Sequence, residues 1–70
     1  MRQSGEILLN GQKESIHTPL SLAELLEQFR IGSPHLAIVV NQEIVPRSER
    51  GRRTIRPGDV IEVIRAVQGG

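Results

Sequence analysis

The sequence predicts an α+β fold in which one helix packs on one face of a mixed sheet of four to five strands. Three observations predict this fold. One stretch, LSLAELLEQFRIG, has helical periodicity, apolar β-branched stretches lie on both sides of it, and the turn signals NG and RPGD separate those stretches. Because one helix covers only one face of a sheet, the other face is expected to be open or to bind a partner.

The hairpin is the first expected element. Asn10-Gly11 is a strong signal for a two-residue turn, because both residues tolerate a positive φ. We expect strands at residues 6–9 and 12–17 around it. Ile7 then lies on one face of the sheet and Leu8 on the other.

The helix is the clearest element, with apolar residues at i, i+3, i+4 and i+7: Leu22, Leu25, Leu26 and Phe29. Ser21 is expected to be the N-cap, and Glu24 completes a capping box. Gly32 follows the last periodic residue and is predicted to be the left-handed C-terminal cap. Pro34 prevents the helix from continuing.

Three strands are expected after the helix, at about residues 36–40, 43–45 and 60–67. Asn41-Gln42 is expected to be the turn between the first two. Pro46 ends the second strand or places it on an edge of the sheet, a polar loop follows, and RPGD matches a type II turn with Gly58 at its third position.

The strands predict an inner and an outer set of apolar side chains. The outer set is expected to be a docking surface for partner proteins, with Arg65 as a steering charge, or else ordinary half-buried sheet surface. The inner set is Ile7, Leu9, Ile38, Val40, Ile61 and Val63, and the outer set is Leu8, Val39 and Ile64.

Composition excludes several classes of function. The 70 residues carry a net charge of +1 and include no cysteine, so disulfides and thiolate metal sites are excluded. A chain this short leaves little volume for a deep pocket of its own. Neither nucleic acid nor a membrane is an expected partner, and the absence of an apolar signal region predicts a cytoplasmic protein.

A cluster of arginines follows the fourth expected strand. It is most simply a solvated loop, with an acidic protein surface or RNA as the alternative contact, although RNA binding usually adds aromatic platforms that this sequence lacks. The cluster comprises Arg47, Arg50, Arg52, Arg53 and Arg56.

The last residues directly follow the final strand. We expect a domain at residues 1–67 and a flexible tail at residues 68–70, which are Gln68, Gly69 and Gly70. From Val67 this tail reaches roughly 10–14 Å at about 3.5 Å per residue. Two glycines make it thin enough to enter a narrow channel, and a terminal glycine leaves its carbonyl carbon open to attack.

The segments LLNGQ, VVNQEIVPRSE and PGDVIEVIRAVQGG resemble the ThiS family of sulfur carrier proteins over nearly the whole chain. The resemblance implies a β-grasp, ubiquitin-like fold and a carrier that acts as a co-substrate, not as an enzyme. It implies that a ThiF-type enzyme consumes ATP to adenylate Gly70, that a persulfide protein supplies sulfur, and that the resulting thiocarboxylate serves the thiazole synthase ThiG. No bound cofactor is implied.

Other functions are also compatible with this fold and tail. The chain also resembles the small subunit of molybdopterin synthase in fold and tail, although VNQEIVPR argues against it. A protein-conjugating modifier or a β-grasp adaptor without sulfur chemistry would also have this pattern of elements. Members of the ThiS family often have an aromatic residue shortly after VPR, where this chain has Arg50 or its neighbours.

Overall fold

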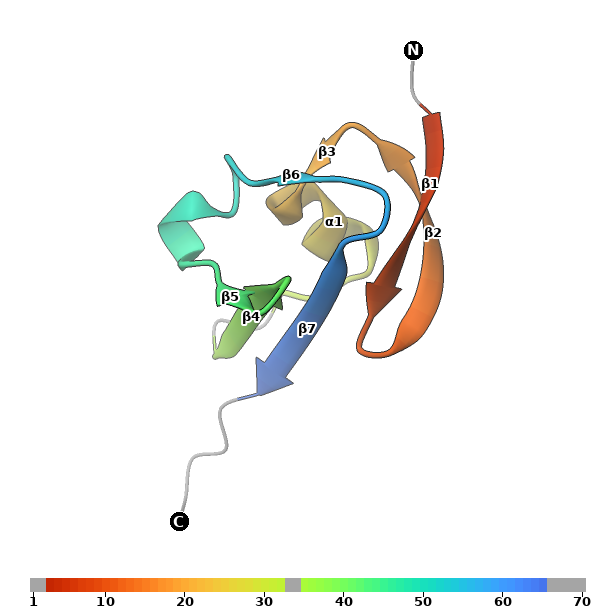
Figure 1. Cartoon of the computed structure of the whole chain (residues 1–70). Helices are drawn as coiled ribbons and strands as arrows, with labels where there is room; N and C mark the ends of the chain where they lie inside the picture. Colours follow the sequence, from red (N-terminus) through yellow and green to blue (C-terminus); the bar gives the residue numbers. More distant parts are fainter. Residues whose placement is uncertain (1–2, 33–34, 66–70) are drawn as a thin grey trace.

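The structure is a computed structural model, and it describes residues 3–32 and 35–65. One mixed sheet of five strands has the order β2-β1-β7-β4-β5. Strand β7 lies in its centre, parallel to β1 and antiparallel to β4 (Figure 1). The expected α+β fold is therefore confirmed. The five strands are β1 (Gln3–Leu9), β2 (Gln12–Thr18), β4 (Leu36–Val40), β5 (Glu43–Ile44) and β7 (Val60–Arg65).

Both expected hairpin turns are present. Asn10 and Gly11 have φ angles of 51° and 82°, and Asn41 and Gln42 have φ angles of 50° and 69°. Consecutive positive φ angles are those of a type I′ turn, whose twist matches that of the strands it joins. The RPGD turn is also confirmed, because Gly58 has a φ of 90° and the Asp59 N–H donates to the Arg56 carbonyl at 3.1 Å.

The helix α1 (Leu22–Gln28) begins with the expected capping box. The Glu24 N–H donates to Ser21 Oγ at 3.0 Å, and the Ser21 N–H donates to Glu24 Oε1 at 2.8 Å. Two more N–H groups of the first turn, those of Leu22 and Ala23, donate to carbonyls of the later loop. These hydrogen bonds attach the start of the helix to a loop that comes about 30 residues later in the sequence.

The end of the helix differs from expectation. The left-handed residue is Arg30, with a φ of 57°, and not Gly32. The Ile31 N–H donates to the Leu26 carbonyl at 2.7 Å, and the Arg30 N–H donates to the Glu27 carbonyl at 3.0 Å. This pair of bonds is a Schellman motif, which requires its left-handed residue two positions after the last helical one. The prediction of Gly32 placed the cap two residues too late.

A second, two-stranded sheet joins β3 (Leu20–Ser21) to β6 (Thr54–Ile55), and the sequence analysis missed both strands. The pair lies beside the start of α1 (Figure 1). The loop expected after Pro46 also contains one turn of 3-10 helix, η1 (Arg47–Glu49). Both features order the segment 47–56, which carries five arginines.

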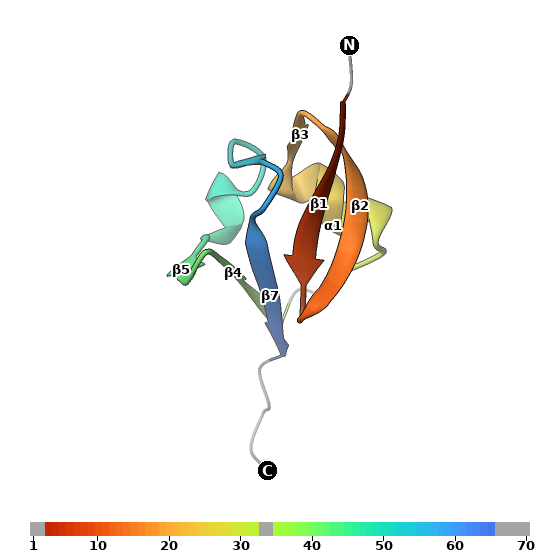
Figure 2. The same cartoon turned by 45° about the vertical axis from the view of Figure 1, so that its right-hand side comes forward.

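The core fills the space between α1 and the inner face of the sheet, with the β1–β2 hairpin on one side (Figure 2). Five of the six predicted inner residues are buried, and Val63 packs against the core partly buried. The core also takes in residues of β2, β3, β6 and α1, and Val45, which follows β5. Its buried members are Ile7, Leu9, Ile16, Leu20, Leu22, Leu25, Leu26, Ile38, Val40, Val45, Ile55 and Ile61.

Candidate functional site

The predicted reactive tail, from Val67 to Gly70, lies outside the described residues. The strand that leads to it is described as far as Arg65, which pairs with Leu36 at the start of β4. Residues 66 and 67 were expected to extend this strand and likewise fall outside the described part. What the structure defines is the platform from which the last five residues extend.

Two asparagine turns fix that platform on both sides. Asn10 Oδ1 accepts from the Val63 N–H at 2.8 Å, and the Asn10 N–H donates to the Ile61 carbonyl at 2.9 Å. On the other side, Asn41 Oδ1 accepts from the Val60 N–H at 2.9 Å, and the Asn41 N–H returns to the Val60 carbonyl at 2.8 Å. Strand β7 is thus held by backbone pairing and by two side chains, so its direction is well defined.

The outer face of the sheet carries an apolar patch. Strand pairing sets Val39 opposite Ile44 and Ala37 opposite Ile64, so these four side chains share the face away from α1. Ile44 is 68% exposed and Ile64 is 50% exposed, whereas Val39, between β5 and β7, is only 9% exposed. We call Ala37, Val39, Ile44 and Ile64 the outer patch. Its exposed area is supplied by the two isoleucines.

The other predicted docking residues lie apart from this patch. Leu8 is half-buried and pairs with Val60 at the opposite end of β7. Arg65 is exposed and shares the face of Leu36, which is the helix side of the sheet. The strongest exposed contribution, Ile44, was missed. The two-residue turn that precedes it sets its register with Val39, so the signal was present in the sequence.

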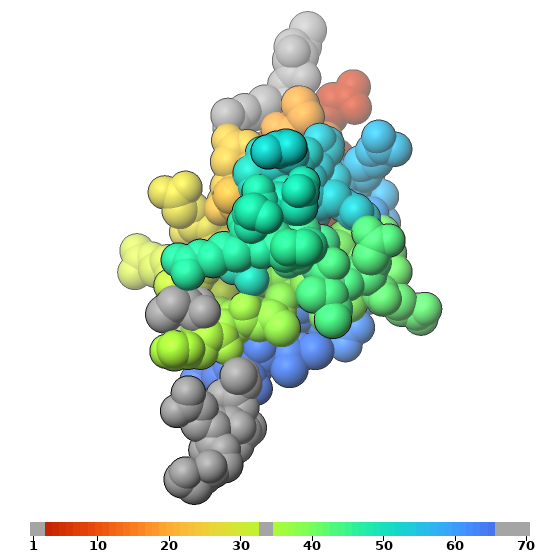
Figure 3. Space-filling model, turned by 90° about the vertical axis from the view of Figure 1, so that its left-hand side faces the viewer, coloured from red at the N-terminus to blue at the C-terminus, as the bar shows by residue number. Residues whose placement is uncertain are grey.

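The arginine cluster is folded onto α1. The carbonyls of Arg50 and Arg53 accept from Ala23 N–H at 3.0 Å and Leu22 N–H at 2.8 Å. Arg50 Nη2 donates to the Leu36 carbonyl at 2.9 Å, while its Nε is buried and has no partner within the described part of the chain. In the space-filling view the teal and cyan segment 47–55 lies between the helix side and the green strands (Figure 3). Arg47, Arg52 and Arg56 are exposed, as expected for a solvated loop, whereas Arg50 and Arg53 are half-buried.

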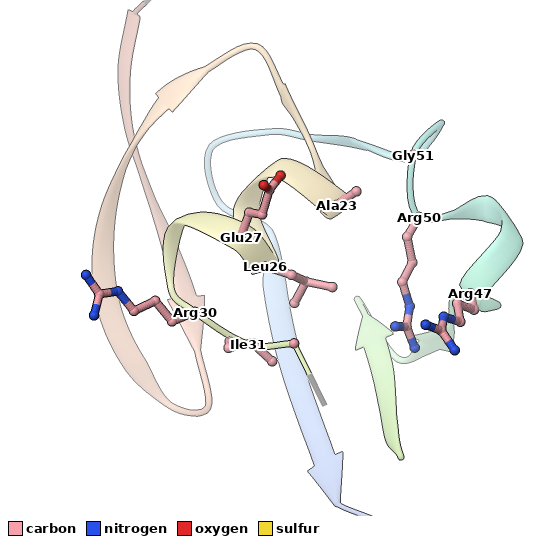
Figure 4. A pocket seen from close by; sticks show the side chains of 9 residues that line it. Ala23, Leu26, Glu27, Arg30, Ile31, Arg47, Arg50 and Gly51 are labelled. Atoms are coloured by element: carbon pink, nitrogen blue, oxygen red, sulfur yellow. The ribbon is translucent and has the colours of Figure 1, made fainter. Parts of the chain in front are cut away.

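A groove separates this segment from α1 (Figure 4). It has a volume of about 480 Å³ and is open to solvent. Leu26 and Ile31 line its helix side, and Arg47 and Arg50 line the opposite side. Such a groove offers an apolar wall that faces a cationic one.

Clusters of metal-ligating side chains and buried polar residues are absent from the described part of the chain. Within residues 3–32 and 35–65 there is no group of three or more metal-ligating side chains and no buried polar or charged residue. In the same ranges no helix has the length and apolar character needed to cross a membrane.

Comparisons with known proteins point to one family. A model of the ThiS family matches residues 4–70 of the chain. The chain is 32% identical over 65 residues to the sulfur carrier protein ThiS of Escherichia coli, and 33% identical over 64 residues to that of Thermus thermophilus. These alignments cover 93% and 91% of the chain, and 98% of each relative.

A third relative is much longer. The chain is 26% identical over 65 residues to a thiazole synthase of Paramagnetospirillum magneticum, and the alignment covers 93% of the chain but only 20% of that protein. Among solved structures, a thiamine biosynthesis protein (ThiS) from Geobacter metallireducens superposes with a TM-score of 0.83 at 22% identity. That match covers 93% of the chain and 99% of the other protein, and it shows that the two share a fold.

Proposed function

The chain belongs to the ThiS family, and we propose that it is the sulfur carrier that supplies thiazole formation in thiamin biosynthesis. One observation carries the proposal: the family match runs through the whole described domain and reaches Gly69 and Gly70. The relatives named sulfur carrier protein ThiS align over 98% of their own length. The match thus includes the residues at which we propose the chemistry to take place.

The chemistry that we propose takes place at Gly70. A carboxylate resists nucleophiles because it is anionic and lacks a good leaving group. A ThiF-type enzyme would consume ATP to convert the Gly70 carboxylate into an acyl-adenylate, with release of pyrophosphate. The terminal sulfur of a persulfide protein then attacks the carbonyl carbon and AMP leaves, which gives an acyl disulfide between Gly70 and the donor. A thiol reductant attacks the donor-side sulfur, the S–S bond breaks, a disulfide forms between the reductant and the donor, and the thiocarboxylate remains on Gly70. The chain contains no cysteine, so the sulfur nucleophile has to be built on the tail.

The partner that takes the sulfur is proposed to be a thiazole synthase. In the Paramagnetospirillum magneticum protein, a segment similar to this chain and a much longer sequence lie in one polypeptide named thiazole synthase. Such an arrangement is typical of partners that work together. In this proposal the chain itself acts as a co-substrate, because its own terminal residue, Gly70, is the group that is modified.

The outer patch is the proposed docking surface for the activating enzyme. It lies on β4, β5 and β7, and β7 is the strand that leads into the tail. An enzyme that covers Ile44 and Ile64 buries apolar area already exposed to water, which favours association by about 25 cal/mol per Å². Binding energy gained on the body offsets the entropy lost when the glycines are ordered, on the order of 1–2 kcal/mol per residue.

The test is an intact-mass measurement. The chain is incubated with ATP, a ThiF-type enzyme, a sulfur donor and a thiol reductant. We expect one oxygen atom to be replaced by sulfur, and tandem fragmentation to place the change on Gly70. Conjugates to lysines of other proteins would indicate a modifier instead, and the absence of both adenylate and thiocarboxylate would overturn the carrier proposal.

Deletion of Gly70 provides the matched control. We expect the deletion to abolish thiocarboxylate formation, because the chain then ends one residue short of the position at which the enzyme reacts. The thermal midpoint should remain that of the full chain, since the described core lies within residues 7–61. A deletion that unfolds the domain would show that the tail has a structural role.

A further inference from the structure

We propose that the groove between α1 and the segment 47–51 is a second docking site, and that it receives an acidic, aliphatic-flanked segment of the thiazole synthase. The inference rests on the proposed function, because it names a contact with the partner proposed there. The groove is separate from the outer patch, which lies on the opposite face of the sheet.

The two walls of the groove call for an occupant with two kinds of surface. Leu26 and Ile31 form an apolar wall, and Figure 4 shows the side chain of Leu26 directed toward the arginine side. Arg47 and Arg50 both line the opposite wall. An aliphatic side chain fits the first wall, and a carboxylate fits the second through charge-assisted hydrogen bonds.

The cationic wall has few internal partners. Arg50 is held in place by the hydrogen bond from its Nη2 to the Leu36 carbonyl. Because this carbonyl is uncharged, the bond does not neutralise the positive charge of the guanidinium. Arg47 is exposed, and no side-chain hydrogen bond or ion pair links it to another described residue. The one acidic residue of the lining, Glu27, belongs to the helix side. An external carboxylate therefore complements two guanidinium groups that no acidic side chain of the described residues neutralises.

The position of the groove favours the synthase as the source of that carboxylate. Arg50 bonds to Leu36, and Leu36 pairs with Arg65, the last described residue before the tail. A protein that takes Gly70 into its active site therefore lies near Leu36 and near Arg50, which lines the groove. With the activating enzyme on the outer patch, the groove remains available for the protein that receives the sulfur.

A matched pair of charge reversals tests the proposal. Arg47→Glu reverses a charge inside the groove, and Arg52→Glu makes the same change at the residue that follows the segment 47–51, outside the groove lining. Both residues are exposed, so neither variant should lose stability. We expect Arg47→Glu to weaken the affinity of the full chain for purified thiazole synthase about tenfold, mainly through a slower association at low salt, and Arg52→Glu to change it less than about twofold. Equal affinities of the two variants would overturn the proposal.

A measurement of thiocarboxylate formation distinguishes a failure of the docking proposal from a failure of the carrier function. Both variants should form the thiocarboxylate at the rate of the unmodified chain, because the groove is not assigned to the activating enzyme. If the unmodified chain binds the synthase but forms no thiocarboxylate, the carrier function fails while the docking site stands. If Arg47→Glu alone fails in activation, the groove belongs to the activating enzyme and the present assignment is wrong.

A cross-link identifies the occupant directly. The chain has no cysteine, so Gly51→Cys provides a unique site for a benzophenone maleimide on the rim of the groove. A Cβ at Gly51 meets no atom within 4 Å, so the change is sterically permitted. We expect it to capture a peptide of the synthase that contains Asp or Glu beside an aliphatic residue. Ser15→Cys on β2 is the control, and equal capture from both sites would contradict the proposal.

Discussion

Gly5 is the one glycine of the described part at which an added Cβ would clash with a neighbouring side chain. A Cβ placed on Gly5 would lie 2.7 Å from Cγ and 3.0 Å from Cβ of Pro57. The Pro57 ring cannot move away easily, because the next residue, Gly58, donates its N–H to the Glu6 carbonyl at 2.7 Å. The contact joins β1 to the turn that starts β7, so it fixes where the central strand begins.

Gly5→Ala should therefore destabilise the domain. We expect a loss of about 1–3 kcal/mol in the free energy of unfolding, because overpacking forces the turn or the strand to shift. Urea denaturation followed by circular dichroism measures it. Gly51→Ala is the control, since a Cβ there meets open space. Adding Pro57→Ala should recover part of the loss, and an additive double variant would contradict the steric explanation.

At the scale of single residues, sequence reasoning succeeded where a residue type specifies its own backbone geometry. Asn10-Gly11 and Gly58 adopt the predicted positive φ angles. Gly5 was not singled out, because its role depends on Pro57, which is 52 residues away in the sequence. Close approaches between distant segments leave no local pattern in the sequence.

At the scale of elements, the two ends of α1 differ in how well the sequence predicted them. Its start was predicted in detail because the capping box is a local pattern. Its end was misplaced because the chain uses Arg30, an ordinary residue, in the left-handed position where glycine is usual. The strands β3 and β6 have two residues each, too few to show alternation, so only their pairing in three dimensions reveals them.

The helix end yields a stability prediction. Arg30→Gly should stabilise the domain by about 0.5–1 kcal/mol, because glycine adopts a φ of 57° without the steric cost that a Cβ imposes. A gain of this size raises the thermal midpoint by several degrees in a domain of this length. Arg30→Ala removes the same charge but keeps the Cβ, so it should give no gain. Equal midpoints for the two variants would refute the explanation.

At the scale of the whole molecule, the fold was predictable and the site was predictable in part. Alternation assigned the inner and outer faces correctly, but it gave Leu8, Val39 and Ile64 equal weight. The structure separates them: Val39 is 9% exposed, Ile64 is 50% exposed, and Leu8 lies beside Val60 at the other end of β7. The exposure of an apolar side chain depends on which strands lie beside it, and the order of strands is a property of the whole sheet.

The outer patch leads to the last prediction, which concerns the activating enzyme. Ile44→Thr combined with Ile64→Thr keeps both residues β-branched, so the strands should tolerate the change. Because both side chains are at least half exposed, the free energy of unfolding should change by less than about 1 kcal/mol. In an adenylation assay with a ThiF-type enzyme we expect the KM for the chain to rise about tenfold with kcat unchanged, as for loss of uniform binding energy.

The control variant is Val60→Thr, on the same face at the far end of β7. It should leave KM within about twofold of its original value, because it removes apolar surface outside the patch. If Val60→Thr raises KM as much as the double variant does, the docking surface covers the whole outer face and is not confined to the end of the sheet from which the tail extends.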